Sequence, residues 1–387
     1  MTLLRCPLPS PPDWHLDWPA LNTRFEWIRA MKDCSQDALH HAEGDVWIHV
    51  KMVCEALASL PEWRGLPEMH REIVFAAALL HDVAKPACTR REDGRITSRG
   101  HSLRGAIQAR RILWEHGANL IAREHVCSLV RYHQIPFYLI ERSEAPRMAL
   151  RISQEARCDF LGMLAKADAL GRACQDQGGL LVRIGLFEEL CREQSCLDRP
   201  WQFPSLLSRF EYFRREGRDP SYQTHDQSRC EVILMAGLPG SGKDSWLTAH
   251  ARNLPVISLD DLRAELGAES TGNQGEVIQA AKERARGLLR SGNSFAWNAT
   301  NLTRDLRSQL VDLFTDYHAR VRIVHVETPC QSLFTRNDQR PRRVPHSAIE
   351  RMLNRWEVPD PAEAPIVQWW VNDDVAKFRQ VNPSEEG

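Results

Sequence analysis

The stretch VILMAGLPGSGKDSW, residues 232–246, decides the fold of the second half of the chain. A short apolar run leads into a glycine-rich turn, and a helical stretch follows. The glycines let successive backbone N–H groups point at a phosphate, the helix start adds partial positive charge, and Lys243 can reach the terminal phosphates. The spacing GxxxxGK predicts a nucleotide-binding loop. Its expected binding residues are Gly237, Gly240, Ser241, Gly242, Lys243, Asp244 and Ser245.

One residue departs from the usual form of such a loop. Asp244 stands where a Ser or Thr normally follows the lysine and ligates Mg²⁺, and Ser245 comes next. A carboxylate oxygen can hold Mg²⁺ directly or through water. The sequence therefore predicts an NTP, either ATP or GTP, with Mg²⁺, and leaves open whether Asp244 or Ser245 contacts the ion.

The two halves of the chain differ in pattern. After residue 230, short apolar runs alternate with helical stretches, which predicts a parallel sheet covered on both faces. The expected strands are 230–237, 256–260, 294–300, 321–328 and 365–371. The first half shows only helical periodicity, which predicts an all-α domain. We expect domains at 1–215 and 231–387, joined by a polar, turn-rich linker at 216–230.

Composition excludes several classes of protein. In the 387 residues, 50 Lys and Arg balance 51 Asp and Glu, so net charge reveals no anionic partner and a nucleic-acid site would have to be a local basic patch. The longest purely apolar run has eight residues, 73–80, far below the roughly 20 that span a membrane. Residues 1–14 meet prolines at once and show no h-region of a signal peptide, so we expect none, and eleven cysteines without a CxxC pair suit a reducing cytoplasm. We therefore expect a cytoplasmic protein without a membrane partner.

Charged residues follow the phosphate loop at two places. Asp260, at the carboxyl end of an expected strand, can accept the proton of an attacking hydroxyl, and Arg263 lies one helical turn further on. The alternative is that Asp260 or Asp261 only caps the next helix. Residues 336–345, RNDQRPRRVP, have the form of a lid loop whose arginines close over donor phosphates. Here the alternative is a solvated basic loop.

The stretches GLPGSGKDSW, SLDDLR, AWNATNL and RNDQRPRRVP together resemble the kinase domain of phage-type polynucleotide kinases, over most of residues 230–358. The resemblance implies transfer of an NTP γ-phosphate to the 5′-hydroxyl of a nucleic-acid end. It assigns Lys243 to the donor, Asp260 as general base and Arg263 to the acceptor's phosphate, with Arg336 and Arg340 as lid arginines. The family carries Asp-Thr-Asn where this chain has Ala299-Thr300-Asn301, so position 299 offers no carboxylate.

Histidines concentrate in the first half, which holds ten of the fifteen. His81 and Asp82 are adjacent where an apolar helix meets Pro86, a pair that is weak evidence alone. Further potential ligands lie on other expected helices: His49, His101, His133 and Asp168. Four imidazoles and two carboxylates would bind one or two divalent transition metals. Lys85, one of only seven lysines, either neutralises phosphate charge or lies on the surface.

HDVAKP followed by GHSLRGA, LVRYHQ and ADALGR resembles the HD phosphohydrolase superfamily, and most closely the HD domain attached to bacterial tRNA nucleotidyltransferases. The match spans roughly residues 45–172. It implies hydrolysis of phosphomonoesters or phosphodiesters that depends on Mn²⁺ or a similar ion. Asp82 and Lys85 would be the catalytic residues.

The pairing of the two domains resembles the bacterial bifunctional end-healing enzymes called HD-Pnk, over nearly the whole chain. That resemblance implies removal of 2′,3′-cyclic phosphate and 2′/3′-phosphate ends together with phosphorylation of 5′-hydroxyl ends. RNA or DNA ends and the NTP donor would be the partners, and an RNA ligase could act in the same pathway. Two alternatives stay open: a nucleotide-pool hydrolase fused to a small-molecule kinase, and a signalling module in which the phosphate loop is a nucleotide-driven switch.

Overall fold

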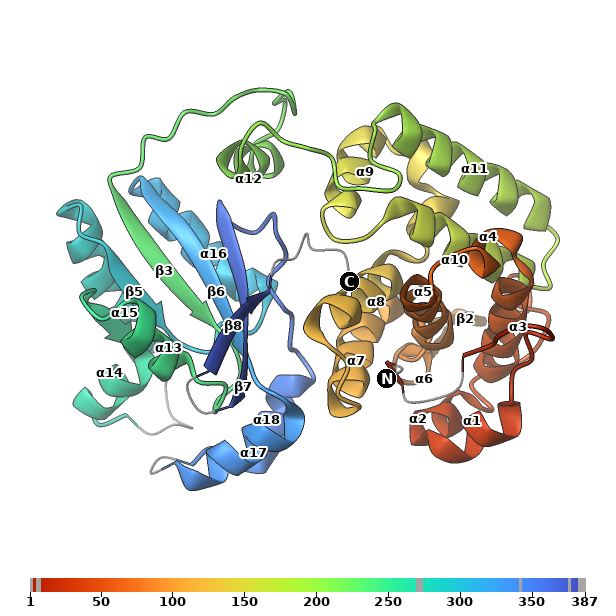
Figure 1. Ribbon diagram of the computed structural model, residues 1–387, viewed down its shortest axis with the longest axis horizontal. Coiled ribbons are helices and arrows are strands. Elements are labelled where there is room, and N and C mark those ends of the chain that lie inside the picture. The colour runs from red at the N-terminus through yellow and green to blue at the C-terminus, as the bar shows by residue number, and fades with distance from the viewer. Residues whose placement is uncertain (1–2, 5–7, 269–273, 341–342, 375–376, 382–387) are drawn as a thin grey trace. The chain divides into compact units, whose positions relative to one another are not determined.

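The computed structural model describes residues 3–4, 8–268, 274–340, 343–374 and 377–381. The chain divides into two compact units, Met1–Trp201 and Gln202–Glu386 (Figure 1). The first is built of helices and the second around a sheet, which confirms the predicted order of a helical domain and an α/β domain.

Helices make up nearly all of the first unit. They are α1 (Trp18–Arg24), α2 (Glu26–Met31), α3 (Val46–Ser59), α4 (Pro61–Arg64), α5 (Glu68–Leu80), α6 (Lys85–Cys88), α7 (His101–Glu115), α8 (Leu120–Tyr132), α9 (Ala145–Ser153), α10 (Cys158–Leu170) and α11 (Gln177–Glu193), with 3₁₀ turns η1 (Ile135–Phe137) and η2 (Leu139–Glu141).

Helix α5 forms the centre of this unit. Every residue from Glu72 to Leu80 is buried, and α3, α8 and α10 pack around the helix (Figure 1). A helix that is apolar on all sides needs neighbours on all sides, so the run 73–80 marks the core. The carboxyl end of α5 is thereby fixed inside the unit.

The helical first unit also carries one short hairpin that the sequence did not predict. Strands β1 (Arg90–Glu92) and β2 (Arg95–Thr97) form an antiparallel hairpin. Asp93 and Gly94 form its turn with φ of +50° and +77°. An Asp-Gly pair with two positive φ angles suits a two-residue hairpin turn. The strands are three residues long and mostly exposed, so they lack the apolar alternation by which strands are recognised.

The second unit has a six-stranded sheet in the order β4-β5-β3-β6-β7-β8. Its strands are β3 (Cys230–Ala236), β4 (Val256–Ser258), β5 (Phe295–Asn298), β6 (Ala319–Glu327), β7 (Ile366–Asp374) and β8 (Lys377–Val381). Its helices are α12 (Leu206–Arg214), α13 (Lys243–His250), α14 (Leu259–Glu265), α15 (Gln274–Arg290), α16 (Arg304–Asp316), α17 (Cys330–Gln339) and α18 (His346–Leu353).

All five expected strands are present and parallel, whereas β8 was not expected and runs antiparallel at the edge. Both faces of the sheet are covered. Val232 and Leu234 of β3 pack with α15 and α16, while Ile233 and Met235 pack with α13. Strand order reverses beside β3, and ligands of such sheets bind where the strands end at this point.

Helix α12 belongs to the second unit, because its Phe210 lies in the core formed by the sheet and α15. The division at residues 201 and 202 therefore differs from the expected end of the first domain at 215.

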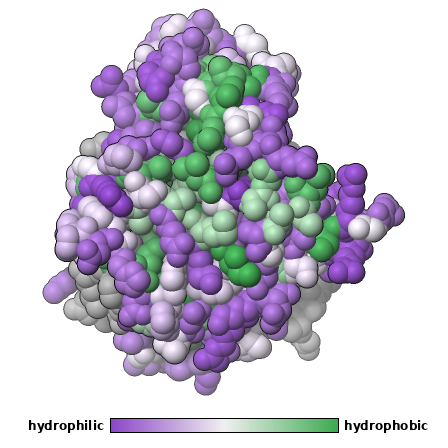
Figure 2. Space-filling model, turned by 90° about the vertical axis from the view of Figure 1, so that its right-hand side faces the viewer, coloured by the Kyte–Doolittle hydropathy of each residue, from purple (hydrophilic) through white to green (hydrophobic). Residues whose placement is uncertain are grey.

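The surface of the face drawn in Figure 2 mixes apolar and polar side chains. Large exposed apolar residues of the first unit include Leu39, Ile48, Val182 and Leu186. Among the described residues, no helix has both the length and the apolar character needed to cross a membrane.

Candidate functional site

The six side chains predicted as metal ligands come together in the first unit. His49 lies on α3, His81 and Asp82 follow α5, His101 begins α7, His133 follows α8, and Asp168 lies on α10. We call these six residues the His/Asp cluster. None of these six residues is more than 6% exposed. Helix packing thus assembles residues that are up to 119 positions apart in the sequence, from 49 to 168.

Backbone carbonyls fix the orientation of three of the imidazoles. His81, His101 and His133 each donate Nδ1–H, at 2.7 Å, to the carbonyl oxygen three residues earlier. A proton on Nδ1 leaves the Nε2 lone pair free toward the cluster, the usual support of a metal-binding histidine. The fourth, His49, has its Nδ1 2.9 Å from Oε1 of Glu43.

The ligand atoms fall into two groups that share Asp82. His49, His81 and Asp82 form one group, and Asp82, His101 and His133 form the other. His81 Nε2 lies 3.2 Å from Asp82 Oδ2, and His101 Nε2 lies 3.4 Å from Asp82 Oδ1. Asp168 Oδ1 lies 3.1 Å from His49 Nε2.

The cluster has the character of a metal site. Buried Asp82 Oδ1 has no hydrogen-bond partner among the described residues, and imidazole nitrogens that face one another do not satisfy each other when neutral. Nitrogen and carboxylate donors suit borderline divalent ions. The residues therefore fit one or two divalent cations, with Asp82 able to contribute to both positions.

Burial and charge set the ionisation of the cluster. Burial lowers the pKa of His133 to about 3 and also lowers that of His101, so both stay neutral, as ligands must. Although burial opposes it, the charge of Lys85 holds the pKa of Asp82 well below its usual range. Burial alone would raise the pKa of Asp168. The positive charge of Arg172 outweighs this effect and holds the pKa well below its usual range.

Lys85 is not on the surface, since it is only 6% exposed. Its Nζ lies 2.7 Å from Asp82 Oδ2 and donates a hydrogen bond to Oε1 of Gln36, also at 2.7 Å. Gln36 and the Arg172 partner of Asp168 were not among the predicted residues. Arg172 could have been found from its spacing, because it lies four residues after Asp168, about one helical turn, although α10 itself ends at Leu170.

The phosphate loop follows β3, and its glycines are required by the backbone. Gly237 has φ +142°, and an added Cβ there would lie 2.3 Å from the carbonyl oxygen of Val326. Gly240 and Gly242 also have positive φ. Lys243, at the start of α13, folds back over the loop and donates to the carbonyl oxygens of Gly237 and Leu238 at 2.9 and 3.0 Å.

Two side chains of the loop suit a bound polyphosphate, and a third suits Mg²⁺. Burial lowers the pKa of Lys243 to about 8, so a bound polyphosphate would favour its charged form. Buried Ser241 Oγ has no hydrogen-bond partner within the described part of the chain. Asp244 is exposed and accepts a hydrogen bond from Asn298 Nδ2 at 2.6 Å, so it faces the end of β5, whereas Ser245 is one position further around the helix.

Asp260 lies in the first turn of α14, but its side chain does not cap the helix. Ser258 Oγ accepts the hydrogen bond from the backbone N–H of Asp261, so Ser258 is the cap. Asp260 is exposed and pairs with Arg263 one turn later. Its charge acts on Lys243 together with the charges of Asp244 and Arg340. The four predicted residues Lys243, Asp244, Asp260 and Arg340 therefore share one electrostatic environment.

The predicted lid differs from its expected form at one end. Arg336 lies within α17 and not in a loop, and its Nη2 donates to Asn372 Oδ1 at 3.4 Å. Leu333 and Asn337 are both buried and lie four residues apart, about one helical turn. The helix α17 therefore continues through Arg336. Arg340 follows the helix, with its Nη2 4.0 Å from Asp244 Oδ2. Residues 341 and 342 of the predicted lid lie outside the described residues.

Comparison with protein families agrees with these two sites. Residues 46–173 match the model of the HD domain, and residues 232–359 match a model described as an AAA domain. The first range contains the whole His/Asp cluster, and the second contains the phosphate loop, Asp260 and Arg340. The chain thus contains one region that matches an HD domain and a second region, with a phosphate-binding loop, that matches an AAA domain.

Three solved structures similar to the chain are kinases by their descriptions. A putative kinase from Chloroflexus aurantiacus is 18% identical, covering 38% of this chain and 86% of its own, with a TM-score of 0.30. A sugar kinase from Janibacter sp. HTCC2649 is 19% identical, covering 37% and 85%, with a TM-score of 0.29. A gluconokinase from Sinorhizobium meliloti is 21% identical, covering 37% and 84%, with a TM-score of 0.28. Likenesses this distant carry no substrate to the present chain.

Proposed function

We propose that this chain heals nucleic-acid ends with two separate centres. The HD domain removes 2′,3′-cyclic phosphate and 2′/3′-phosphate groups, and the P-loop domain transfers the γ-phosphate of an NTP to a 5′-hydroxyl. One observation carries the proposal: a single chain holds a buried His/Asp cluster that fits divalent cations and a phosphate loop beside the Asp260–Arg263 pair. RNA or DNA ends are the proposed substrates, and a ligase would join the healed ends.

In the proposed HD reaction, water forms a bond to phosphorus and the bond from phosphorus to a ribose oxygen breaks. Divalent cations bound by the His/Asp cluster would polarise the phosphoryl group and lower the pKa of water. The chain's own contribution is orientation and charge. Carbonyl acceptors hold three imidazoles in one tautomer, and Lys85, 2.7 Å from Asp82, brings a positive charge next to the place where the phosphate enters.

In the proposed kinase reaction, Lys243 exchanges its two loop carbonyl partners for the terminal phosphates of the NTP. Asp260 accepts the proton of the 5′-hydroxyl while the oxygen–phosphorus bond forms and the γ-phosphate leaves the β-phosphate. Arg263 then turns from Asp260 to a phosphate of the acceptor strand. Asp244, which faces the end of β5, is the proposed oxygen ligand of Mg²⁺.

The test uses an oligonucleotide with a 5′-hydroxyl and a 2′,3′-cyclic phosphate, incubated with the purified protein, NTP, Mg²⁺ and Mn²⁺. Both termini are identified by mass. Asp82→Ala should abolish phosphate removal and spare phosphorylation. Asp260→Ala should do the reverse, with a loss of about 10²–10⁴-fold in kinase rate. Asp261→Ala is the matched control, because Asp261 is the exposed neighbour on α14 and should retain kinase activity.

Other outcomes would contradict the proposal. Loss of both reactions in either folded variant would refute two independent centres. Turnover of free nucleotides with no reaction at oligonucleotide ends would favour a nucleotide-pool hydrolase fused to a small-molecule kinase. NTP hydrolysis without a phosphorylated acceptor would favour a nucleotide-driven switch.

A further inference from the structure

Four arginines, three in the β1–β2 hairpin and one just after it, have no partner of opposite charge in the part of the chain that the structure describes. The guanidinium groups of Arg90, Arg91, Arg95 and Arg99 are exposed, and no ion pair or hydrogen bond joins them to the described residues. Glu92 and Asp93 offset two of the four charges within residues 90–99. The segment is therefore a local basic patch in a chain whose charges balance overall.

Some other arginines of the first unit are paired: Arg111 lies 2.8 Å from Glu115, Arg183 lies 3.0 Å from Asp176, and Arg192 contacts Glu189. The exposed Arg24 and Arg29 of this unit, like the hairpin arginines, have no carboxylate partner among the described residues. The hairpin segment differs in that four such arginines fall within the ten residues 90–99. Unpaired arginines are available to bind phosphate groups of a partner.

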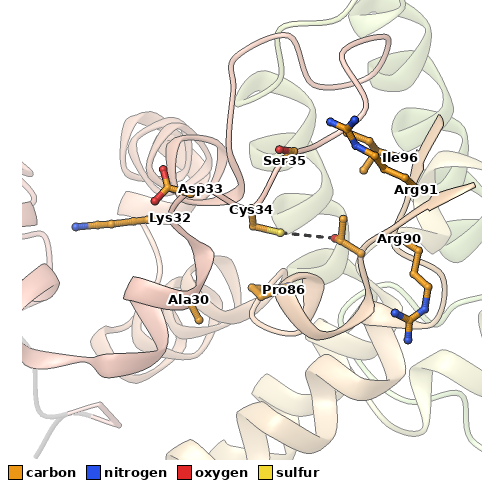
Figure 3. Close-up of a pocket in the computed structure, with 10 residues that line it drawn as sticks. Ala30, Lys32, Asp33, Cys34, Ser35, Pro86, Arg90, Arg91 and Ile96 are labelled. Carbon is orange, nitrogen blue, oxygen red and sulfur yellow. Dashed lines mark hydrogen bonds between the residues drawn. The ribbon is translucent and has the colours of Figure 1, made fainter. Parts of the chain in front are cut away.

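A pocket of about 380 Å³ lies against the hairpin. Arg90, Arg91 and Ile96 line one side, and residue 30 together with residues 32–35, among them Lys32 and Asp33, lines the other, with Pro86 between them. Figure 3 shows the side chains of Lys32 and Arg90 directed away from each other on opposite sides of the pocket. Positive charges therefore flank the pocket and do not converge inside it. That arrangement suits a polyanion passing across the pocket better than a small anion enclosed in it.

The hairpin is connected directly to the His/Asp cluster. Pocket-lining Thr89 shares a hydrogen bond of 2.8 Å with Ser98 Oγ, which closes the base of the hairpin. Ser98 in turn accepts the Nδ1–H of His101 through its carbonyl oxygen. Just before the hairpin, Lys85 contacts Asp82. A nucleic-acid strand bound along the hairpin would therefore lie next to the segments that carry Asp82 and His101, two residues of the His/Asp cluster.

We propose that residues 90–99 and the adjoining pocket bind the sugar-phosphate backbone of a nucleic-acid strand whose terminal phosphate enters the His/Asp cluster. This inference rests on the proposed function of the HD domain and adds how the substrate is held. Exposed arginines give binding that depends on salt and not on base sequence.

The test compares two variants that each lose three positive charges. The hairpin variant is Arg90→Gln, Arg91→Gln and Arg95→Gln. The control variant is Arg183→Gln, Arg192→Gln and Arg199→Gln, at exposed arginines of the same unit that have carboxylate neighbours. The probe is a single-stranded oligonucleotide with 5′-fluorescein and a 3′-hydroxyl, as RNA and as DNA. Neither proposed centre can react with it. Fluorescence anisotropy of the full-length protein gives Kd at several salt concentrations.

The hairpin variant should bind at least about tenfold more weakly at low salt, and its slope of log Kd against log salt should fall by about 2, since three phosphate contacts contribute about 0.7 each. The control variant should keep the wild-type slope. In hydrolysis, the ratio of kcat/KM on an oligonucleotide 3′-phosphate to kcat/KM on p-nitrophenyl phosphate should fall by a similar factor. An equal fall on both substrates would indicate structural damage and overturn the inference.

Failure of the inference and failure of the proposed function give different results. If the wild type removes 3′-phosphates from oligonucleotides but the hairpin variant keeps its Kd and salt slope, the binding surface is refuted and the function stands. If the wild type leaves oligonucleotide ends unchanged, the proposed function is refuted. In that case a weakened Kd of the hairpin variant would still support a nucleic-acid surface, and an unchanged Kd would refute it.

Discussion

Nucleotide binding by the P-loop domain should weaken as the pH rises through about 8. Lys243 is held over the loop by two carbonyl oxygens, and burial lowers its pKa from 10.5 to about 8. A bound NTP brings negative charges within contact of the ammonium, which raises the pKa in the complex. Binding is therefore linked to uptake of a proton by Lys243 whenever the free lysine is neutral.

The size of the effect follows from the lowered pKa. With a pKa of about 8, the charged fraction of Lys243 falls from roughly nine tenths at pH 7 to roughly one tenth at pH 9. The Kd for NTP should therefore rise about tenfold, or about 1.4 kcal/mol, between these pH values. A lysine of ordinary pKa would change Kd by only about 3% over the same interval. The NTP itself loses its last proton near pH 6 to 7, so it contributes little above pH 7.5.

Isothermal titration calorimetry in buffers of different ionisation enthalpy measures both Kd and the protons taken up. At pH 8 the wild type should take up about half a proton for each NTP bound. Lys243→Arg should show no uptake and a flat pH profile, because a guanidinium stays charged throughout. A flat profile in the wild type would show that Lys243 is already protonated in the free protein, and the reasoning from its burial would be wrong.

Three further predictions concern stability. Gly237→Ala should destabilise the P-loop domain by about 1–3 kcal/mol and abolish NTP binding, since its φ is +142° and the new Cβ would lie 2.3 Å from a backbone oxygen; Gly287→Ala, in open space on α15, should be neutral or slightly stabilising in the same thermal melts. Arg110→Ala should cost about 1.5–3 kcal/mol in urea unfolding because it removes the charged hydrogen bonds to buried Glu124, which keeps Arg123 as its other partner, whereas Arg111→Ala, which removes a partly exposed pair one residue away, should cost less than about 0.5 kcal/mol. EDTA should lower the Tm of the HD domain and Mn²⁺ at 100 times its Kd should restore about 2.7 kcal/mol, an effect that must disappear in Asp82→Ala if the His/Asp cluster is where the ion binds.

The central elements of both units could be predicted from sequence because their signals are local. The apolar run 73–80 predicts a buried helix, and the strand–turn–helix pattern around Gly237 predicts the phosphate loop, which the structure confirms. The hairpin at 90–97 could not be recognised from periodicity, since its short strands bury little. The antiparallel strand β8 was missed for the same reason, because most of its residues are exposed.

Sequence reasoning could list the cluster's residues but not how they are supported. That His49 faces Glu43 and that Lys85 reaches Gln36 depends on how α3 and the loop before it pack against α5. Glu43 is only six residues before His49, whereas Gln36 is 49 residues before Lys85, and no spacing rule predicts either contact. The role of Ser258 as a cap was also hidden, because two aspartates follow it and either could have served equally well.

The carboxylate missing from position 299 and the unusual one at position 244 are related in space. Asp244 accepts a hydrogen bond from Asn298, the residue that ends β5 and precedes Ala299. A carboxylate on α13 therefore reaches the same end of β5 at which the phage-type kinases carry their aspartate. Mg²⁺ requires oxygen ligands at particular positions around the phosphates, and any strand or helix that reaches these positions can supply them. In the proposed kinase reaction, Asp244 would therefore supply at this end of β5 the carboxylate that position 299 lacks, and one requirement for Mg²⁺ would explain both departures from the phage-type pattern.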